Sequence, residues 1–315
     1  MRLFKMRVAL IGSADFGKAA LEAFLDRGDE VVAVFCPPDN PKSSKPEVLK
    51  EAAIAKGLKP LQFPSLKGPE ASQAMIDCNA DICVMAYVLQ FVPQELVKIP
   101  KHGTIQYHPS LLPKYRGPSA INWAIALGEE TTGLTIFRPS DGLDEGAVIL
   151  QKEVAIGSDD TLGKIYFDHL FPIGIKALLE AADLVVAGKH QEVIQDESQA
   201  NYEGWFDINA AQIHWASHIS QIYNQIRACN PAPGAWTKFG EQKVQIFDCH
   251  KHVVATFGAV KGKPGEVTQI TLDSFFVACH GGQIEVLKAK GAAGKVSGAE
   301  LAKELNLQLG QFFVL

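Results

Sequence analysis

The sequence predicts an α/β protein with a mostly parallel sheet in its first part and a small β-barrel in its last part. Short apolar strands alternate with helical segments up to about residue 188, and closely spaced short strands follow from about residue 244. A chain of 315 residues is long enough for two domains that each bury a core. We therefore place one domain at 1–188, a linker at 189–204 and a second domain at 205–315.

Strands and helices alternate along the first domain. Strands are expected at 7–11, 30–35, just before 63, 81–87, 103–107, 133–137 and 147–154, and helices at 18–26, 46–56, 72–76, after 118, and at 159–186 with an interruption at Pro172. Because a helix lies between successive strands, the sheet should be Rossmann-like, mostly parallel and covered on both faces. The turn at 12–17 lacks the G-x-G-x-x-G spacing, so its glycines are expected to serve packing rather than a dinucleotide.

The chain changes character after a polar stretch without periodicity at 188–204. A helix is expected at 212–227, and short strands follow at 244–248, 253–257, 266–270, 275–278 and 283–288. Glycine, proline, lysine and aspartate separate these strands. This pattern is typical of a small barrel, here OB-like.

Composition favours a soluble, cytoplasmic protein. Hydrophobic residues make up 47% and charged residues 21% of the sequence, and no apolar run is long enough to cross a bilayer, so no membrane partner is expected. The apolar run near the start is too short for a signal peptide. Six scattered cysteines without CxxC spacing suit reduced thiols. A net charge of −5 disfavours a nucleic-acid partner, although it leaves room for a local basic patch.

A histidine and an aspartate stand in loops that follow two expected strands. His108 comes directly after the strand at 103–107 and precedes Pro109, and Asp144 lies in the polar loop at 140–146. Ligands of open parallel sheets lie beyond the carboxyl ends of the strands, so the two side chains are expected to meet at one edge. A carboxylate would orient the imidazole and favour its protonated form, and such a pair moves protons during acyl transfer. The pattern also fits a loop histidine with a satisfied hydrogen bond and an aspartate that serves its turn.

Two other candidates are given structural interpretations. His250 and His252 alternate on an expected strand, but without companion ligands they are interpreted as surface residues, and no metal site is predicted. Ser110 has no accompanying base pattern, so its hydroxyl is expected to fix the loop rather than to act as a nucleophile.

The two loops resemble those of the formyltransferases that use 10-formyltetrahydrofolate. The motifs are HPSLLPKYRG at 108–117 and DGLDEG at 141–146. RVALIGSADFG near the start, AYVLQFVPQELV at 86–97 and IRACNPAPGAW at 226–236 extend the resemblance over nearly the whole chain. It implies a formyltransferase-type α/β domain followed by a barrel like that of methionyl-tRNA formyltransferases.

Within this family the chain is similar to the N-terminal hydrolase domain of 10-formyltetrahydrofolate dehydrogenases. YHPSLLPKYRGPSAINW at 107–123, LQKE at 150–153 and LFPIGIK at 170–176 carry that likeness. Because the sequence ends soon after the barrel, a stand-alone enzyme without a dehydrogenase half is expected. Methionyl-tRNA formyltransferases typically carry a longer basic loop after the second strand, whereas the stretch at 37–46 is short and holds two lysines. This difference weakens the case for tRNA.

The resemblance also implies roles for single residues. It makes His108 the catalytic histidine and Asp144 its acidic partner. An asparagine ordinarily stands two residues before the histidine, and here the position is Gln106. Its amide can stabilise an oxyanion, but the extra methylene displaces the donor, which fits a hydrolase or an altered acceptor better than a standard transferase.

The pterin is expected to bind against the loop after the strand at 81–87 and against the loop that holds Asp144, mainly through backbone hydrogen bonds. The implied substrate-binding residues are Tyr87, Val88, Leu89, Gln90, Phe91, Val92, Ser110, Arg116, Asp141, Gly142 and Leu143. Arg116 fits contact with an anionic acceptor or folate tail, and a surface ion pair fits it equally well.

The resemblance implies an enzyme that removes or transfers the formyl group of 10-formyltetrahydrofolate and gives tetrahydrofolate, and no metal is expected. Water or a small-molecule acceptor is the first expectation, initiator methionyl-tRNA the second, and an amino-sugar nucleotide the third. A continuous basic face on the barrel would favour tRNA. The competing class, a non-catalytic folate or nucleotide binder, requires that His108 and Asp144 lie apart or are buried without access.

Overall fold

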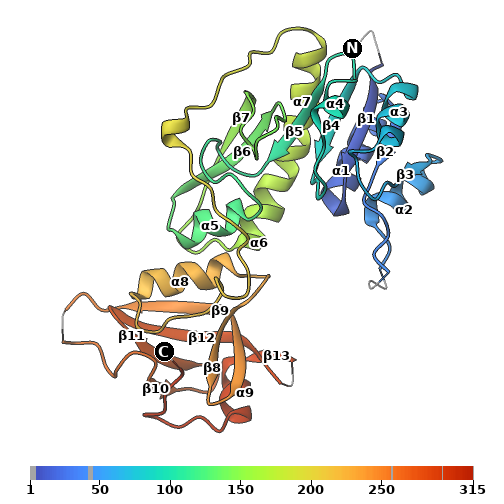
Figure 1. The fold of residues 1–315 in the computed structure, drawn as a ribbon. Helices are drawn as coiled ribbons and strands as arrows, with labels where there is room; N and C mark the ends of the chain where they lie inside the picture. Colours follow the sequence, from blue (N-terminus) through green and yellow to red (C-terminus); the bar gives the residue numbers. More distant parts are fainter. Residues whose placement is uncertain (1–4, 42–44, 257, 293, 315) are drawn as a thin grey trace. The chain divides into compact units, whose positions relative to one another are not determined.

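The computed structural model describes residues 5–41, 45–256, 258–292 and 294–314, which form two compact units (Figure 1). The first unit holds the chain up to Gly117, then Gly133–Val154 and His169–Tyr202, and the second holds Pro118–Thr132, Ala155–Asp168 and the chain from Glu203. The second unit thus includes two segments from within the predicted domain at 1–188. Continuous domains at 1–188 and 205–315, with a linker at 189–204, stay a prediction.

A seven-stranded sheet is the framework of the first unit. Its order is β3 (Pro60–Leu61), β2 (Glu30–Phe35), β1 (Arg7–Gly12), β4 (Ile82–Ala86), β5 (Thr104–His108), β6 (Thr131–Phe137) and β7 (Val148–Ala155). The first five strands in this order pair in parallel, and β6 runs antiparallel to β5. The predicted mostly parallel sheet is confirmed. The direction of β6 could not be predicted, because hydrophobic periodicity does not encode strand direction.

Helices cover both faces of this sheet (Figure 1). They are α1 (Ala14–Asp26), α2 (Val48–Ala55), α3 (Pro69–Asp77), α4 (Gln94–Val97) and α7 (Phe171–Val186). On one face, α1 contacts β1 and β4, and α7 contacts β4 and β5. On the other face, apolar residues of α3 and α4 join a core cluster with Ile11, Phe35 and Met85. Burial of apolar side chains on both faces fixes the sheet and hence the loops at its edge.

The predicted long helix at 159–186 is divided into three parts. α6 (Leu162–Lys164) leads into a π-helical segment at Ile165–Leu170, and α7 follows with Pro172 in its first turn. Proline has no backbone N–H, so it is tolerated at a helix start but cannot continue the hydrogen-bond ladder of a helix already under way. The predicted interruption therefore falls just before Pro172.

An antiparallel sheet is the core of the second unit, which confirms the predicted fold class. Its order is β10 (Val267–Ile270), β11 (Phe275–Cys279), β12 (Gly282–Gly291), β9 (Gln242–Val253) and β8 (Ala235–Phe239), with β13 (Gly294–Ser297) paired to β12. The helices α5 (Ala120–Ala126), α8 (Ile219–Ala228) and α9 (Gly298–Glu304) also belong to this unit.

Several predictions for this unit were wrong in detail. The strand expected at 244–248 is part of the longer β9, which ends at Val253, so no separate strand starts there; Phe257 lies outside the described residues. The predicted helix at 212–227 begins only at Ile219, because the His218 side chain caps its first turn. β8, β13 and α9 were not predicted. Among the described residues, no helix has both the length and the apolar character needed to span a bilayer.

Candidate active site

A cavity of about 190 Å³ opens at the edge of the first unit's sheet. It is lined by Met85, Val88, Gln90, Phe91, Val92, Gln106, Phe137, Pro139, Ser140, Asp141, Gly142, Leu143 and Asp144. β4, β5 and β6 each contribute one of these residues, and the loops after β4 and β6 contribute the others. The two loops singled out from the sequence therefore border one cavity.

His108 and Asp144 lie next to each other although 36 positions separate them in the sequence. His108 is the last residue of β5, and its Nδ1 atom lies 3.5 Å from Oδ2 of Asp144. Each side chain is only 7% exposed. The Nε2 atom of His108 lies 2.8 Å from the carbonyl oxygen of Tyr115. A carbonyl oxygen only accepts hydrogen bonds, so Nε2 carries a hydrogen and Nδ1 is the atom turned toward the carboxylate.

The local backbone conformation and the backbone N–H of Gly117 hold the Asp144 carboxylate in place. Asp144 has a φ of 56°, in the left-handed region that side-chain-bearing residues seldom adopt. Its Oδ2 atom accepts a hydrogen bond of 2.9 Å from the backbone N–H of Gly117. Two residues on, a Cβ atom at Gly146 would lie 1.5 Å from the carbonyl oxygen of Arg138, so only glycine fits there. The backbone conformation of this loop therefore requires parts of the DGLDEG motif, in addition to the chemistry of Asp144.

Gln106 lines the cavity from β5, two residues before His108. Successive strand residues point to opposite faces, so Gln106 and His108 are directed to the same side of the sheet. Gln106 pairs in register with Met85 on β4 and with Phe137 on β6, both of which also line the cavity. No hydrogen bond engages its side-chain amide in the described part of the chain, so the amide is available to a bound molecule.

The loop after β4 contributes only part of its predicted set. Val88, Gln90, Phe91 and Val92 line the cavity, and the Gln90 Nε2 atom donates to the Phe63 carbonyl oxygen at 3.0 Å.

Tyr87 and Leu89 are not among the lining residues. Their side chains are about half exposed, at 49% and 58%, and Tyr87 has a φ of 60°. The loop directs these two side chains toward solvent. The amino-acid sequence of the loop does not show which of its side chains face the cavity.

Ser110 and Arg116 are engaged within the protein rather than at the cavity. The Ser110 hydroxyl donates to the Lys114 carbonyl oxygen at 2.6 Å, in keeping with a loop-fixing role. Arg116 is 6% exposed and its guanidinium donates to both carboxylate oxygens of Glu197, at 2.9 and 2.6 Å. These bonds lower the pKa of Glu197 below its ordinary value. Of the two interpretations of Arg116, the ion pair describes its contacts.

Four lining residues were missed by the sequence reasoning: Met85, Phe137, Pro139 and Ser140. Met85 and Phe137 are apolar strand residues and look like ordinary core in the sequence. Pro139 and Ser140 lie directly before the DGLDEG motif, so the signal that could have found them was their position at a strand end.

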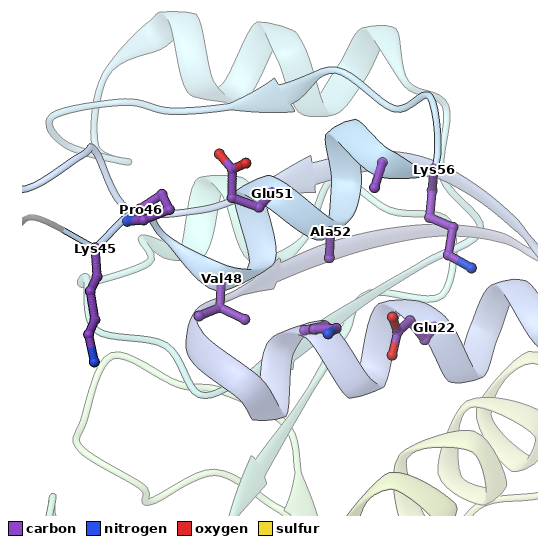
Figure 2. Close-up of a pocket in the computed structure, with 9 residues that line it drawn as sticks. Glu22, Lys45, Pro46, Val48, Glu51, Ala52 and Lys56 are labelled. Atoms are coloured by element: carbon purple, nitrogen blue, oxygen red, sulfur yellow. The ribbon is translucent and has the colours of Figure 1, made fainter.

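A larger cavity of about 500 Å³ lies between α1 and α2, apart from all of these residues. Figure 2 shows Val48 and Ala52 pointing from α2 toward α1, whereas Glu51 points away from it. None of the predicted catalytic or substrate-binding residues lines this cavity. Its size alone does not make it a candidate active site.

His250 and His252, which were interpreted as surface residues, lie on β9 of the antiparallel sheet. His252 Nε2 lies 2.8 Å and His250 Nδ1 3.8 Å from Oε2 of Glu285. Within residues 5–41, 45–256, 258–292 and 294–314, no three histidine, cysteine, aspartate or glutamate side chains are grouped so that they could hold a metal ion.

The fold and the cavity define an α/β protein with a histidine–carboxylate pair beside the loops of a sheet edge. The sequence pattern of the formyl transferase family matches residues 6–181, and that of the formyl transferase C-terminal domain matches residues 208–305. The chain therefore belongs to the formyl transferase family, which confirms the resemblance drawn from its motifs.

Curated relatives include two kinds of enzyme. The methionyl-tRNA formyltransferase of Marinobacter nauticus is 34% identical over 90% of this chain and 91% of its own length. The mitochondrial 10-formyltetrahydrofolate dehydrogenase of Mus musculus is 38% identical over 248 residues, 77% of this chain. The chain spans only about a quarter of such dehydrogenases, 27% in the mouse protein.

Solved structures with the same fold are more distant in sequence. HypX from Aquifex aeolicus, in complex with tetrahydrofolic acid, superposes with a TM-score of 0.66 at 19% identity and covers 99% of this chain and 51% of HypX. WlaRD, a sugar 3N-formyl transferase, superposes with a TM-score of 0.67 at 18% identity, over 90% of this chain and 97% of WlaRD. These likenesses support the fold.

Proposed function

We propose that this protein removes the formyl group of 10-formyltetrahydrofolate and releases tetrahydrofolate, with water or a small-molecule amine as the acceptor. The observation that carries this proposal is the His108–Asp144 pair, 3.5 Å apart, beside a cavity that presents the Gln106 amide. Two findings support formyl-folate as the donor. The chain belongs to the formyl transferase family, and the names of several similar proteins include a folate. Glutamine in place of asparagine favours an acceptor other than that of a standard transferase.

The proposed reaction is a direct attack on the formyl carbon. The nucleophile adds to the carbonyl, and negative charge develops on the formyl oxygen. Gln106 Nε2 donates a hydrogen bond to that oxygen, and the positive charge of a protonated His108 imidazole stabilises it further through space. Asp144 orients the imidazole and takes up the proton that the nucleophile loses. The tetrahedral intermediate then collapses, the bond from carbon to N10 breaks, and N10 accepts the proton that Asp144 had taken up, so that tetrahydrofolate leaves; with water the other product is formate.

The pterin would bind between the two loops that line the cavity. Val88, Phe91 and Leu143 supply apolar contacts there, and the backbone of 139–142 supplies hydrogen-bonding groups. A cavity of about 190 Å³ suits one fused-ring head group, while the rest of the folate extends into solvent. Ground-state affinity therefore depends mainly on these loops and turnover mainly on the three polar side chains.

The test is to incubate the protein with 10-formyltetrahydrofolate alone, with a small amine, with initiator methionyl-tRNA and with an amino-sugar nucleotide. Tetrahydrofolate is followed by absorbance, and formate or formylated product by mass spectrometry. We expect tetrahydrofolate to appear without any macromolecular acceptor. Release that requires the tRNA or the sugar nucleotide would reject water and small amines as acceptors.

A second candidate function, methionyl-tRNA formylation, is favoured by a basic face on the antiparallel sheet of the second unit. Trp236, Gln245, Lys290 and Lys295 are cross-strand neighbours in one row over β8, β9, β12 and β13. Lys243 Nζ lies 4.5 Å from the centre of the Trp236 ring, and Lys295 Nζ lies 4.0 Å from that of Phe247. Lysines interleaved with aromatic rings suit phosphates and stacked bases.

Charge reversal on this face separates the two functions. The double variant Lys290→Glu and Lys295→Glu should leave acceptor-free release of tetrahydrofolate unchanged if water or an amine is the acceptor. If tRNA is the acceptor, the KM for tRNA should rise at least about tenfold, since each lost phosphate contact weakens binding. Lys98→Glu with Lys101→Glu, on exposed residues of the first unit, is the matched control.

A further inference from the structure

We propose that Gln195 is a positioning residue that sets the placement of Asp144, an inference that rests on the proposed function of the His108–Asp144 pair. Gln195 lies in the stretch at 189–204 that the sequence assigns to a linker, and no motif marks it. It is nevertheless 6% exposed, and its side-chain amide makes four hydrogen bonds within the first unit. Because all four hydrogen bonds form together only in one arrangement, the buried amide stabilises that arrangement of its partners.

The donor side of this amide holds the backbone around Asp144. Gln195 Nε2 donates to the carbonyl oxygen of Asp144 at 2.8 Å and to that of Gly146 at 2.7 Å. The two bonds hold the backbone on either side of Glu145. Asp144 has a left-handed backbone conformation, which is unfavourable without such support. Gln195 therefore stabilises the conformation that turns the Asp144 carboxylate toward His108.

The acceptor side of the amide fixes which way it points. Arg116 donates to Gln195 Oε1 from Nε at 3.2 Å and from Nη2 at 2.9 Å. A guanidinium only donates hydrogen bonds, so a flipped Gln195 would set its NH₂ group against Arg116 and its oxygen against the two carbonyls. Glu197 holds Arg116 in turn. The sequence of contacts runs from Glu197 through Arg116 and Gln195 to Asp144.

The same segment also supports the loop that bonds His108. Asn201 Oδ1 accepts from the backbone N–H of Tyr115 at 2.5 Å, and the carbonyl of Tyr115 is the partner of His108 Nε2. The backbone carbonyl of Asn201 accepts from the N–H of Arg116 at 3.1 Å. Residues 195–201 thus contact both partners of the pair, Asp144 through Gln195 and His108 through Tyr115. We call residues 195–201 the positioning segment.

The variant Gln195→Glu separates the two sides of the amide. Glutamate keeps the size of glutamine and the acceptor for Arg116, so folding should be retained, but it has no donor for the carbonyl oxygens of Asp144 and Gly146. Its second oxygen would face those oxygens, and the loop should shift. The matched control is Gln191→Glu, which makes the same charge change at an exposed position just before the segment.

We expect kcat for tetrahydrofolate release to fall between about tenfold and a hundredfold in Gln195→Glu, because displacement of a catalytic group by about 1 Å has effects of that size. KM for 10-formyltetrahydrofolate should change less than about threefold, since the loop after β4 is intact. The pH profile of kcat should also shift, because the geometry between His108 and Asp144 changes. Glu197→Gln, at a side chain that is 67% exposed, should lower kcat a few fold without loss of folding.

Crystal structures of wild type and of Gln195→Glu test the placement independently of turnover. We expect the Nδ1–Oδ2 separation of His108 and Asp144 to exceed the 3.5 Å of the present structure in the variant only. A folded Gln195→Glu variant with wild-type separation, kcat and pH profile would overturn the inference. Absence of tetrahydrofolate release from the wild-type protein with every acceptor would instead contradict the proposed function, and the crystallographic separation would still decide the role of Gln195.

Discussion

The His252–Glu285 pair of the second unit is closer than the His108–Asp144 pair of the first unit, yet it is the weaker candidate for catalysis. In the second unit, His252 Nε2 lies 2.8 Å from Glu285, and the histidine side chain is 48% exposed. In the first unit, His108 and Asp144 are 3.5 Å apart, and each is 7% exposed. The His108–Asp144 pair borders the cavity of about 190 Å³, through Asp144, and His108 is the last residue of β5 in the mostly parallel sheet. Surroundings, rather than distance, distinguish a candidate active site from a surface contact.

The two carboxylates also differ in how they are held. Asp144 is fixed by backbone geometry, by Gly117 N–H and by the positioning segment. Glu285 is held by side chains: although its partial burial acts in the opposite direction, hydrogen bonds from Ser274 and His252 lower its pKa below the ordinary value. A group fixed through the backbone keeps its place when a substrate enters, which suits catalysis better than a flexible surface contact.

The largest expected effect is that of removing the His108 imidazole, and removal of the His252 imidazole is the comparison. His108→Ala should lower kcat for tetrahydrofolate release by roughly a hundred- to ten-thousand-fold, because general acid–base help is lost. Affinity for tetrahydrofolate, measured by calorimetry, should stay within about threefold. His252→Ala should leave both quantities unchanged. Comparable losses in the two variants would mean that the pair in the first unit has no special role.

A smaller effect is expected at Gln106. Gln106→Leu replaces the polar amide by an apolar side chain of similar volume and removes the donor for the developing oxyanion, so kcat should fall about tenfold to a hundredfold with little change in KM. Steady-state kinetics with 10-formyltetrahydrofolate give both values. Gln106→Asn is the informative partner, since the shorter amide should favour transfer to an amine over hydrolysis. Full activity of the leucine variant would remove the amide from the mechanism.

The smallest effect is expected for stability at Glu285. Its folded-state pKa is lowered, so the carboxylate stabilises the fold above its unfolded pKa, and this contribution is lost as pH falls through the folded value. Glu285→Gln should reduce the free energy of unfolding at pH 7 by about 1 kcal/mol or less, as for other partly exposed pairs. Denaturant titrations at pH 7 and near pH 3 measure the difference. If the variant lost as much free energy of unfolding near pH 3 as at pH 7, this explanation would be contradicted.

The edge of the first unit's sheet shows which site residues can be placed from the sequence and which cannot. Alternating apolar strands and helices predict the parallel sheet, and the strand that ends at His108 predicts where the imidazole lies. The DGLDEG loop does meet His108, but it follows the antiparallel β6, so the rule for the carboxyl ends of parallel strands does not explain its place. Tyr87 and Leu89 were expected to contact substrate; their side chains are about half exposed and do not line the cavity, and their contact with substrate stays a prediction.

The residues themselves determined the order of strands and helices in the first unit, the two motifs and the family, because these depend on local periodicity and on short contiguous patterns. Only the tertiary structure decided that β6 is antiparallel, that Met85 and Phe137 line the cavity, and that Gln195 and Arg116 support Asp144. Contacts between residues 50 or more positions apart leave no periodic trace in a single sequence. They exist only once the core has packed and brought the segments together.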